Sequence, residues 1–268
     1  MAGSHRSPRD DDEGRVNVFD LSGKVAVITG GSRGIGRSIA QGFAEAGASV
    51  VIASRKLDAC KTAASELASS TGQRAEPVAC HVGRWDDCDA LADTVYGLFG
   101  RCDILVNNAG MSPQYPDLAS ITEEYYDKVA SVNLKGPFRL SSVVGTRMAQ
   151  ADGGSIINVS TIGSLRPSAN ELVYACAKAG LNALTIGLAE AFGPSVRANA
   201  ILPGAIATDI AKSWPTEMIR AATDGVPLGR MGTAEDFIGT ALWLASDASA
   251  FVTGELVRVD GGAYRQMS

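Results

Sequence analysis

The sequence predicts an α/β fold in which a doubly wound parallel sheet of about seven strands is flanked by helices. Short, almost continuously apolar runs alternate with longer amphipathic stretches, as expected for parallel strands that are covered on both faces. A glycine-rich turn follows the first run, and ligands of this architecture bind at the carboxyl ends of the strands. No change in composition divides the chain, so we expect one domain over residues 18–268.

The expected elements alternate in order along the chain. The apolar runs predict strands at residues 25–29, 49–53, 77–80, 104–107, 155–159, 196–201 and 256–259. The amphipathic stretches predict helices from the glycine-rich turn to about residue 46, and then at residues 57–69, 86–99, 122–148, 172–191 and 234–245. Gly47 lies where a glycine commonly ends a helix, and Gly136-Pro137 predicts a disturbance within the long helical region.

Composition and charge argue against several classes of protein. The 268 residues are 46% hydrophobic and 20% charged, as in a soluble globular protein. With 24 basic against 29 acidic residues, the chain does not resemble a nucleic-acid binder, and no run of about 18 apolar residues predicts a membrane span. The cysteines show no CxxC pair or zinc-ligand spacing, so we expect reduced thiols in a cytoplasmic protein and no metal. Residues 1–17 are polar and are expected to be a disordered tail.

The first predicted strand runs directly into a glycine-rich turn at residues 29–36 (TGGSRGIG). Glycine lets the backbone turn tightly and lets a phosphate approach closely. The helix that begins here points unpaired N–H groups at the anion, and a position between strand and helix in the first βαβ unit strengthens the signal. The residues of the turn expected to bind a dinucleotide are Gly30, Ser32, Arg33, Gly34, Ile35 and Gly36.

The glycine spacing GxxxGxG resembles the short-chain dehydrogenase/reductase family, which has a Rossmann fold. The resemblance extends from residue 21 to residue 262, with the later motifs in order: Asn107-Asn108-Ala109-Gly110, Asn133, Tyr174-Ala175-Cys176-Ala177-Lys178, Pro203-Gly204 with Thr208, and Thr253-Gly254 before Asp260-Gly261-Gly262. It implies hydride transfer between a nicotinamide and a carbonyl or secondary alcohol. It also implies a substrate lid at about residues 209–231, and cofactor contacts at Asn108, Ala109, Gly110, Pro203, Gly204, Ile206 and Thr208.

The choice of dinucleotide depends on the end of the second predicted strand, Ala53-Ser54-Arg55-Lys56. An NAD site usually places a carboxylate there for the ribose 2′-hydroxyl, and this chain has none. Arg55 and Arg33 can instead hold a 2′-phosphate through charge-assisted hydrogen bonds, which favours NADP(H); the alternative is that both are surface charges. After the third strand, either His81 hydrogen-bonds to the adenine edge, or its backbone and Val82 make the only contacts.

Tyr174 and Lys178 are four residues apart on an expected helix and therefore share one face. Such a pair ordinarily means packing with a snorkelling lysine, but this helix follows the fifth strand at the ligand-binding edge. Carbonyl reduction needs a proton donor, and a neighbouring ammonium is expected to lower a phenol pKa from about 10. Tyr174 could then donate a proton in reduction and accept one in oxidation.

The resemblance implies the same role for Tyr174 and adds partners for it. Lys178 would also bind the nicotinamide ribose, and Asn133 would hold a water that links Lys178 to solvent. The family's catalytic serine, thirteen residues before the tyrosine, is Thr161 here, which keeps the hydroxyl but restricts χ1. Ser160 should face the opposite side of an extended strand, so Thr161 is preferred to Ser160 or Ser164.

Substrate and partners are less constrained. The resemblance allows acyl thioesters, sugars, polyols and other ketones, and it implies a homotetramer formed through the long helices and residues 256–267. Basic residues on the long helical region either attract an acidic carrier protein or form a solvated or oligomer-facing surface: Lys128, Lys135, Arg139 and Arg147. The alternative function is a catalytically silent NADP(H)-binding sensor or scaffold, against which the intact Tyr174, Lys178 and Asn133 argue.

Overall fold

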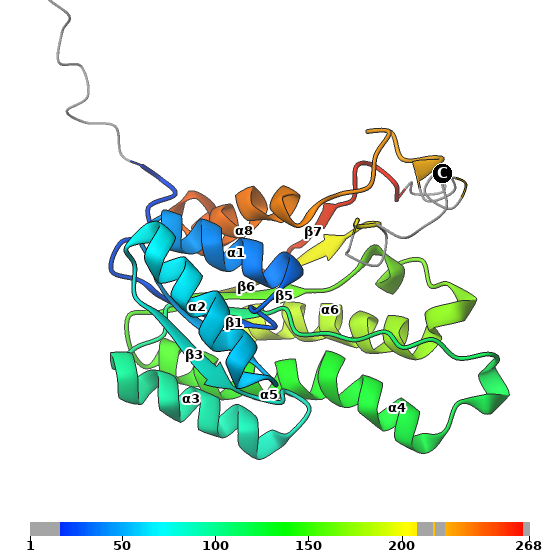
Figure 1. Ribbon diagram of the computed structural model, residues 1–268, viewed down its shortest axis with the longest axis horizontal. Helices are drawn as coiled ribbons and strands as arrows, with labels where there is room; N and C mark the ends of the chain where they lie inside the picture. Colours follow the sequence, from blue (N-terminus) through cyan, green and yellow to red (C-terminus); the bar gives the residue numbers. More distant parts are fainter. Residues whose placement is uncertain (1–16, 208–216, 218–222, 265–268) are drawn as a thin grey trace, which may run out of the picture.

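A seven-stranded sheet forms the centre of the protein and confirms the predicted fold class (Figure 1). The computed structural model describes residues 17–207, 217 and 223–264. All strand pairs are parallel, in the order β3-β2-β1-β4-β5-β6-β7. The strands are β1 (Val25–Thr29), β2 (Ser49–Ser54), β3 (Ala75–Ala79), β4 (Ile104–Asn107), β5 (Gly154–Val159), β6 (Val196–Pro203) and β7 (Leu256–Val259).

Helices cover both faces of this sheet (Figure 1). They are α1 (Gly34–Glu45), α2 (Leu57–Thr71), α3 (Trp85–Phe99), α4 (Glu123–Ala130), α5 (Gly136–Ala149), α6 (Leu172–Phe192) and α8 (Ile238–Ala245). One hydrophobic cluster joins α1, α2 and α8 to one face of the sheet. The other cluster joins α3, α5 and the end of α6 to the opposite face.

The continuous apolar runs follow from this double coverage. Successive side chains of a strand point to opposite faces, so Ala26 and Ile28 of β1 enter the first cluster, whereas Val25 and Val27 enter the second. All five residues of β1 are buried. A strand that was covered on one face only would have alternated apolar and polar residues.

The long helical region is divided by a single π-helical segment, η2 (Ser131–Lys135), between α4 and α5. The disturbance predicted at Gly136-Pro137 therefore lies just before these two residues. The Gly136 N–H donates to the Ser131 carbonyl, five residues back, and Pro137 has no N–H to continue the ladder. A Cβ at Gly136 would lie 2.2 Å from the Val82 carbonyl oxygen. Only glycine at this position therefore lets the helix approach the segment after β3 so closely.

Among the residues that the structure describes, one helix is long and apolar enough to cross a membrane, and it is a core helix. The stretch Ala169–Phe192, which contains α6, has a mean hydropathy of 1.4, and half of it is buried inside the protein. It packs against β6, α4 and α5. Its apolar character therefore serves packing against the sheet.

The carboxyl ends of β1 and β4 form the point where the order of the strands reverses. β1 pairs with β2 on one side and with β4 on the other, and Ile28 lies opposite Val106. The connections that leave these two strands run to opposite sides, and such a point opens a ligand-binding crevice in a doubly wound sheet. The predicted site residues follow β1, β2, β3, β4, β5 and β6 at this edge.

Candidate active site

The glycine-rich turn packs closely against Asn108, the residue after β4. Gly30 and Gly34 have φ values of 67° and 56°, in the left-handed region that favours glycine. A Cβ at Gly30 or Gly36 would lie 2.8 or 2.4 Å from the Asn108 Nδ2 atom. That nitrogen donates to the Thr29 carbonyl at 2.9 Å, so the amide holds the turn in place and any larger side chain would displace it.

The first turn of α1 is available to an anion. Arg33 is the N-cap residue and has an extended backbone. Its side chain makes no capping hydrogen bond to the N–H groups of the first turn. The N–H groups that begin a helix have no partner within it, and they attract a phosphate through their charge and direction. The turn and the helix together thus have the shape and the donors that a pyrophosphate requires.

A polar network joins the strand ends below this turn, and sequence reasoning assigned it no role. The Thr29 hydroxyl accepts hydrogen bonds from the Asn108 and Ala109 N–H groups at 3.0 and 3.1 Å. The Asn107 amide donates to Asn158 Oδ1 on β5 at 2.9 Å. A polar residue at the carboxyl end of each of three neighbouring strands was the available signal. The network fixes the segment that carries Asn108, Ala109 and Gly110.

Arg33, in the turn after β1, and Arg55, directly after β2, are both exposed. The Ser32 hydroxyl donates to the Ser54 hydroxyl at 3.3 Å, which joins the residues that precede the two arginines. Neither guanidinium forms an ion pair or a side-chain hydrogen bond within the described part of the chain. Both charges are therefore free for a ligand at this edge.

His81 and Val82 follow β3 in a tight turn. The His81 Nδ1 atom accepts a hydrogen bond from the Gly83 N–H at 3.1 Å, and the His81 N–H donates to Asp87 Oδ2 at 3.0 Å. The ring is half-buried and Val82 is buried. With Nδ1 accepting a hydrogen bond, the Nε2 atom of the neutral ring carries the proton and has no partner among the described residues, so both interpretations of His81 stay open.

Tyr174, Thr161 and Lys178 lie together at the carboxyl end of β5. The Thr161 side chain lies close enough to the Tyr174 hydroxyl to lower its pKa. The Lys178 Nζ atom lies 5.8 Å from the centroid of the Tyr174 ring and donates to the Val159 carbonyl at 2.7 Å. Two hydroxyls and one amine, held by β5 and α6, therefore share a small space beside the crevice.

Ser160 and Ser164 are turned toward the protein interior. The Ser160 hydroxyl donates to the Lys178 carbonyl at 3.3 Å, and the Ser164 hydroxyl donates to the Thr161 carbonyl at 2.6 Å. The Asn182 amide in turn donates to the Ser164 oxygen at 2.8 Å. Of the three hydroxyls considered from sequence, the structure brings Thr161 to Tyr174.

Asn133 lies within the π-helical segment and its side chain is fully buried. Its amide donates to the Met111 and Val129 carbonyls at 2.8 and 2.9 Å and accepts from the Met111 N–H at 3.2 Å. A Cβ at Gly110 would lie 3.0 Å from Asn133 Oδ1 and 3.6 Å from the Lys178 Nζ atom. The Asn133 side chain thus pins the segment after β4 beside Lys178.

Burial shifts the pKa values of both Tyr174 and Lys178. Burial first, and the Glu171 charge second, raise the pKa of Tyr174 to about 12, against the lowering effect of the Thr161 side chain. Burial lowers the pKa of Lys178 to about 7. The expected lowering of the Tyr174 pKa by a neighbouring ammonium is therefore not found, because the desolvation of the phenolate outweighs other effects.

Glu171 is a site residue that sequence reasoning missed. It precedes α6, one helical turn before Tyr174, and its side chain is half-buried. A Cβ at Gly163 would lie 3.0 Å from Glu171 Oε1 and 3.5 Å from Thr161 Oγ1. The signal in the sequence was an acidic residue three positions before Tyr174, but only the fold brings it to Thr161.

The turn after β6 closes the other end of the site. Pro203 is buried as the last residue of β6, and a Cβ at Gly204 would lie 2.8 Å from the Asp260 Cα atom. Ile206 forms a parallel bridge with Gly232. Thr208 lies outside the described residues, as does most of the expected lid at 209–231, of which residues 217 and 223–231 are described.

Comparisons with known proteins place the chain in a family. A family model described as Enoyl-(Acyl carrier protein) reductase matches residues 30–264. The 3-oxoacyl-(acyl-carrier-protein) reductase FabG of Chlamydia muridarum is 38% identical over 243 residues, 90% of this chain and 98% of the relative. The L-rhamnose 1-dehydrogenase (NAD(P)(+)) of Azotobacter vinelandii is 38% identical over 251 residues, which cover 91% of this chain and 98% of the relative.

Solved structures give the same result. A short-chain type dehydrogenase/reductase from Mycobacterium marinum has a TM-score of 0.85 at 34% identity, with 93% of this chain and 98% of that chain covered. A chain from Beutenbergia cavernae, assigned as an NAD(P)-dependent gluconate 5-dehydrogenase and solved with NADP at low occupancy, has a TM-score of 0.86 at 35% identity and covers 92% of this chain and 98% of its own.

The fold and the site define a nicotinamide-dependent oxidoreductase of the doubly wound class. The chain belongs to the short-chain dehydrogenase/reductase family, whose members act on carbonyl and alcohol groups with an NAD(P) cofactor.

Proposed function

We propose that the chain is an NADP(H)-dependent carbonyl reductase or alcohol dehydrogenase, in which Tyr174 gives a proton in reduction and takes one in oxidation. One observation supports this most strongly. The hydroxyl-bearing side chains of Thr161 and Tyr174 lie together beside the buried amine of Lys178 at the carboxyl end of β5, close enough for the Thr161 side chain to lower the pKa of Tyr174. A packing pair would need neither the second hydroxyl nor the position at the ligand-binding edge.

The residues at the carboxyl edge fit a dinucleotide. Gly30 and Gly36 let the turn pack directly against Asn108, whereas a Cβ at Gly34 would meet no atom within 4 Å, so the outer side of the turn is open. The uncapped start of α1 offers N–H donors to a pyrophosphate there. When bound, the nicotinamide supplies or accepts the hydride at the substrate carbon. Gly30, Ser32, Gly34, Ile35 and Gly36 would hold the phosphates.

The remaining contacts run along the same edge. We assign Asn108, Ala109 and Gly110 to the middle of the dinucleotide, and Val82, with the backbone of His81, to the adenine. The turn after β6, with Pro203, Gly204, Ile206 and Thr208, would receive the nicotinamide, and Lys178 and Tyr174 its ribose.

The preference for NADP(H) is supported by charge. Arg33 and Arg55 are exposed, without ion pairs among the described residues, and β2 ends without the carboxylate that a 2′-hydroxyl would require. Two free guanidinium groups suit a dianionic 2′-phosphate. We expect kcat/KM to be higher with NADPH than with NADH, and equal values would contradict the assignment.

The variant Arg55→Ala tests the same point with a matched control. A charge-assisted hydrogen bond lost here should lower kcat/KM for NADPH by about tenfold or more and leave NADH unchanged. Arg74→Ala is the control, because Arg74 precedes β3 at the opposite end of the strand and pairs with Glu76 at 2.8 Å. A loss with both cofactors in Arg55→Ala would point to damage to the fold instead.

The chain's own groups perform the proton chemistry. With its pKa raised to about 12, Tyr174 is protonated at neutral pH and can donate to an oxygen that gains negative charge during carbonyl reduction. Thr161 can hold the same oxygen, because its side chain already reaches Tyr174. These protonation states suit reduction better than oxidation, which requires the phenolate.

Lys178 and Asn133 complete the site. Lys178, with a pKa of about 7, changes its protonation near neutrality and lies over the Tyr174 ring, so it can accept or return a proton during turnover. The Asn133 side chain is engaged with Met111 and Val129, so a water relay would fall to its main chain in the π-helical segment. We assign the Asn133 side chain to positioning.

The test of the function is the variant Tyr174→Phe. It should abolish the ketone-dependent oxidation of NADPH and leave NADPH binding, followed by fluorescence, largely intact. A silent sensor or scaffold would instead give a wild-type protein that binds NADPH and reduces none of a panel of ketones, aldehydes, acyl thioesters and sugar-derived carbonyls.

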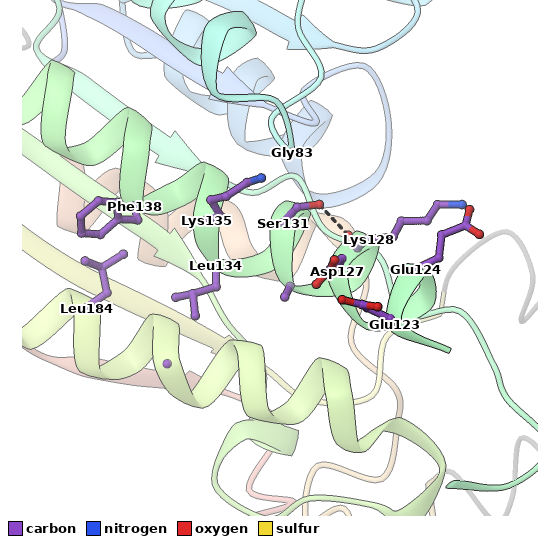
Figure 2. Close-up of a pocket in the computed structure, with 12 residues that line it drawn as sticks. Gly83, Glu123, Glu124, Asp127, Lys128, Ser131, Leu134, Lys135, Phe138 and Leu184 are labelled. Atoms are coloured by element: carbon purple, nitrogen blue, oxygen red, sulfur yellow. Dashed lines mark hydrogen bonds between the residues drawn. The ribbon is translucent and has the colours of Figure 1, made fainter. Parts of the chain in front are cut away.

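We also propose a homotetramer in the cytoplasm. Figure 2 shows Leu134, Phe138 and Leu184 pointing into one open groove between α5 and α6, with Lys128 beside the acidic start of α4. Phe138 is 46% exposed and lies beside the 41% exposed Trp85, with ring centroids 6.3 Å apart. An exposed patch of neighbouring apolar side chains is a feature of interaction surfaces. The described cysteines are all free thiols, as expected in a reducing compartment.

The basic residues of this region favour the oligomer over a carrier protein. Arg139 forms two hydrogen bonds with Asp89, at 2.5 and 2.6 Å, and its guanidinium lies over the Trp85 ring. Arg147 pairs with Asp93 at 2.5 Å. These two charges are already matched within the chain and offer little to an acidic partner.

A further inference from the structure

The carboxylate of Glu171 lies beside the two hydroxyls that the proposed reaction uses. A Cβ built on Gly163 would meet both Glu171 Oε1, at 3.0 Å, and Thr161 Oγ1, at 3.5 Å, so the two oxygens flank the same point. The Thr161 hydroxyl accepts a hydrogen bond from the Gly163 N–H at 3.1 Å, and the same side chain lies close enough to Tyr174 to lower its pKa. The glycine at 163 leaves the space that the carboxylate occupies.

Glu171 is held in this place by a contact from another part of the fold. The Tyr115 hydroxyl donates to the Ala169 carbonyl at 2.6 Å and accepts from the Leu172 N–H at 2.8 Å. These two bonds bracket Glu171 on both sides. The Tyr115 ring is itself packed edge-on against Tyr125, with ring centroids 5.8 Å apart, so the start of α6 is anchored to the segment after β4.

The carboxylate has no partner of its own. Among the described residues, nothing forms a hydrogen bond or an ion pair with its oxygens, although the side chain is half-buried. This burial partly desolvates the carboxylate and so raises the pKa of Glu171. An ionised carboxylate only accepts hydrogen bonds, and a desolvated one without a donor is unfavourable. A ligand that brings a donor would relieve this cost.

We propose that Glu171 determines substrate specificity by accepting a hydrogen bond from a hydroxyl on the carbon next to the reacting carbonyl. The preferred substrates are therefore α-hydroxy ketones and, in the reverse direction, vicinal diols. The inference rests on the proposed function, because Thr161 and Tyr174 must hold the carbonyl oxygen for Glu171 to reach the neighbouring group.

The position of the carboxylate also disfavours other substrates of the same reaction. A 3-oxoacyl thioester has no hydrogen-bond donor on the carbons that flank its ketone, so it would leave Glu171 without a partner. A substrate with a carboxylate close to the ketone would meet a like charge in a partly desolvated site. Both classes lose the interaction that a hydroxyl group gains.

The experiment compares two ketones that differ by one hydroxyl, hydroxymethyl ethyl ketone and methyl ethyl ketone, with NADPH as reductant. The quantity measured is the ratio of kcat/KM for the hydroxyketone to kcat/KM for methyl ethyl ketone. When this ratio is compared between the wild-type protein and a variant, the intrinsic reactivities of the two ketones cancel. Glu171→Gln should lower this ratio by about tenfold, the loss expected for a hydrogen bond to a charged acceptor. The Glu171 charge also raises the pKa of Tyr174, so Glu171→Gln changes a property of the proton donor that is common to both ketones, and this common effect cancels in the ratio.

Glu190→Gln is the matched control. Glu190 is exposed on α6, the helix that Glu171 precedes, and its substitution removes the same charge from the chain. It should leave the ratio unchanged. A ratio that also stays unchanged in Glu171→Gln, or a fall that is equal for both ketones, would overturn the proposal. Melting temperature and NADPH binding, measured on each variant, separate a specific loss from unfolding.

The outcomes for the two proposals can be told apart. If the wild-type protein reduces both ketones but Glu171→Gln leaves the ratio of kcat/KM values unchanged, the proposed role of Glu171 in specificity is wrong and the reductase function stands. If the wild-type protein reduces neither these ketones nor any member of the wider carbonyl panel, the proposed function fails and this inference fails with it.

Discussion

Removal of the Thr161 hydroxyl tests the assignment of the group that shares the substrate oxygen with Tyr174. The Thr161 side chain reaches Tyr174, so Thr161→Ala removes a donor to an oxygen that gains charge in the transition state. Such donors contribute about 100-fold to 1000-fold in kcat, or about 3–4 kcal/mol. The effect on folding should be smaller, because Thr161 is only half-buried and its other side-chain contact is the Gly163 N–H at 3.1 Å.

Ser160→Ala is the matched control for this prediction. The Ser160 hydroxyl is buried and bonds to the Lys178 carbonyl at 3.3 Å and the Ser164 hydroxyl at 3.5 Å, both long contacts. Its loss should cost about 1 kcal/mol of stability or less and change kcat by no more than about twofold. Thr161→Ser should retain most of the activity, because it keeps the hydroxyl.

The assay is NADPH oxidation with a saturating ketone, together with the melting temperature of each variant. A larger loss of kcat in Ser160→Ala than in Thr161→Ala would refute the reasoning, since it would move the donor to a hydroxyl that the structure directs at the protein interior. Equal losses in both variants, with unchanged melting temperatures, would contradict it as well.

Three other predictions follow from burial and packing. Burial lowers the pKa of Lys178 to about 7 from an ordinary 10.5, so between these pH values the unfolded chain binds more protons than the folded chain. The free energy of unfolding of the wild-type protein should therefore rise with pH in this range relative to that of Lys178→Met. Equal pH profiles of the two proteins in chemical unfolding would contradict this. Gly36→Ala places a Cβ 2.4 Å from the Asn108 Nδ2 atom and should cost about 1–3 kcal/mol and weaken NADPH binding, whereas Gly97→Ala, with nothing within 4 Å, should stabilise α3 by up to about 1 kcal/mol. If the proposed tetramer forms through this groove, Phe138→Glu should lower the mass measured by light scattering, and an unchanged mass would show that the groove is not part of the interface.

Much of the fold could be predicted because its signals are local. Each strand lies within two residues of its predicted range, since a run such as 25–29 shows both the length and the double burial of a parallel strand. The glycine spacing at 30–36 and the four-residue spacing of Tyr174 and Lys178 are local as well. The position of the helix disturbance was less well predicted, because the π-helical segment depends on how Gly136 packs against Val82.

The sequence by itself therefore determined the order of the elements, the place of the glycine-rich turn and the spacing of the tyrosine–lysine pair, because short-range periodicity and spacing encode all three. The tertiary structure alone decided which hydroxyl meets Tyr174, how burial sets the pKa values of that residue and Lys178, and that Glu171 lies beside Thr161. These features depend on contacts between residues that are brought together by packing, and desolvation in particular is a property of the whole surrounding fold, which no local pattern contains.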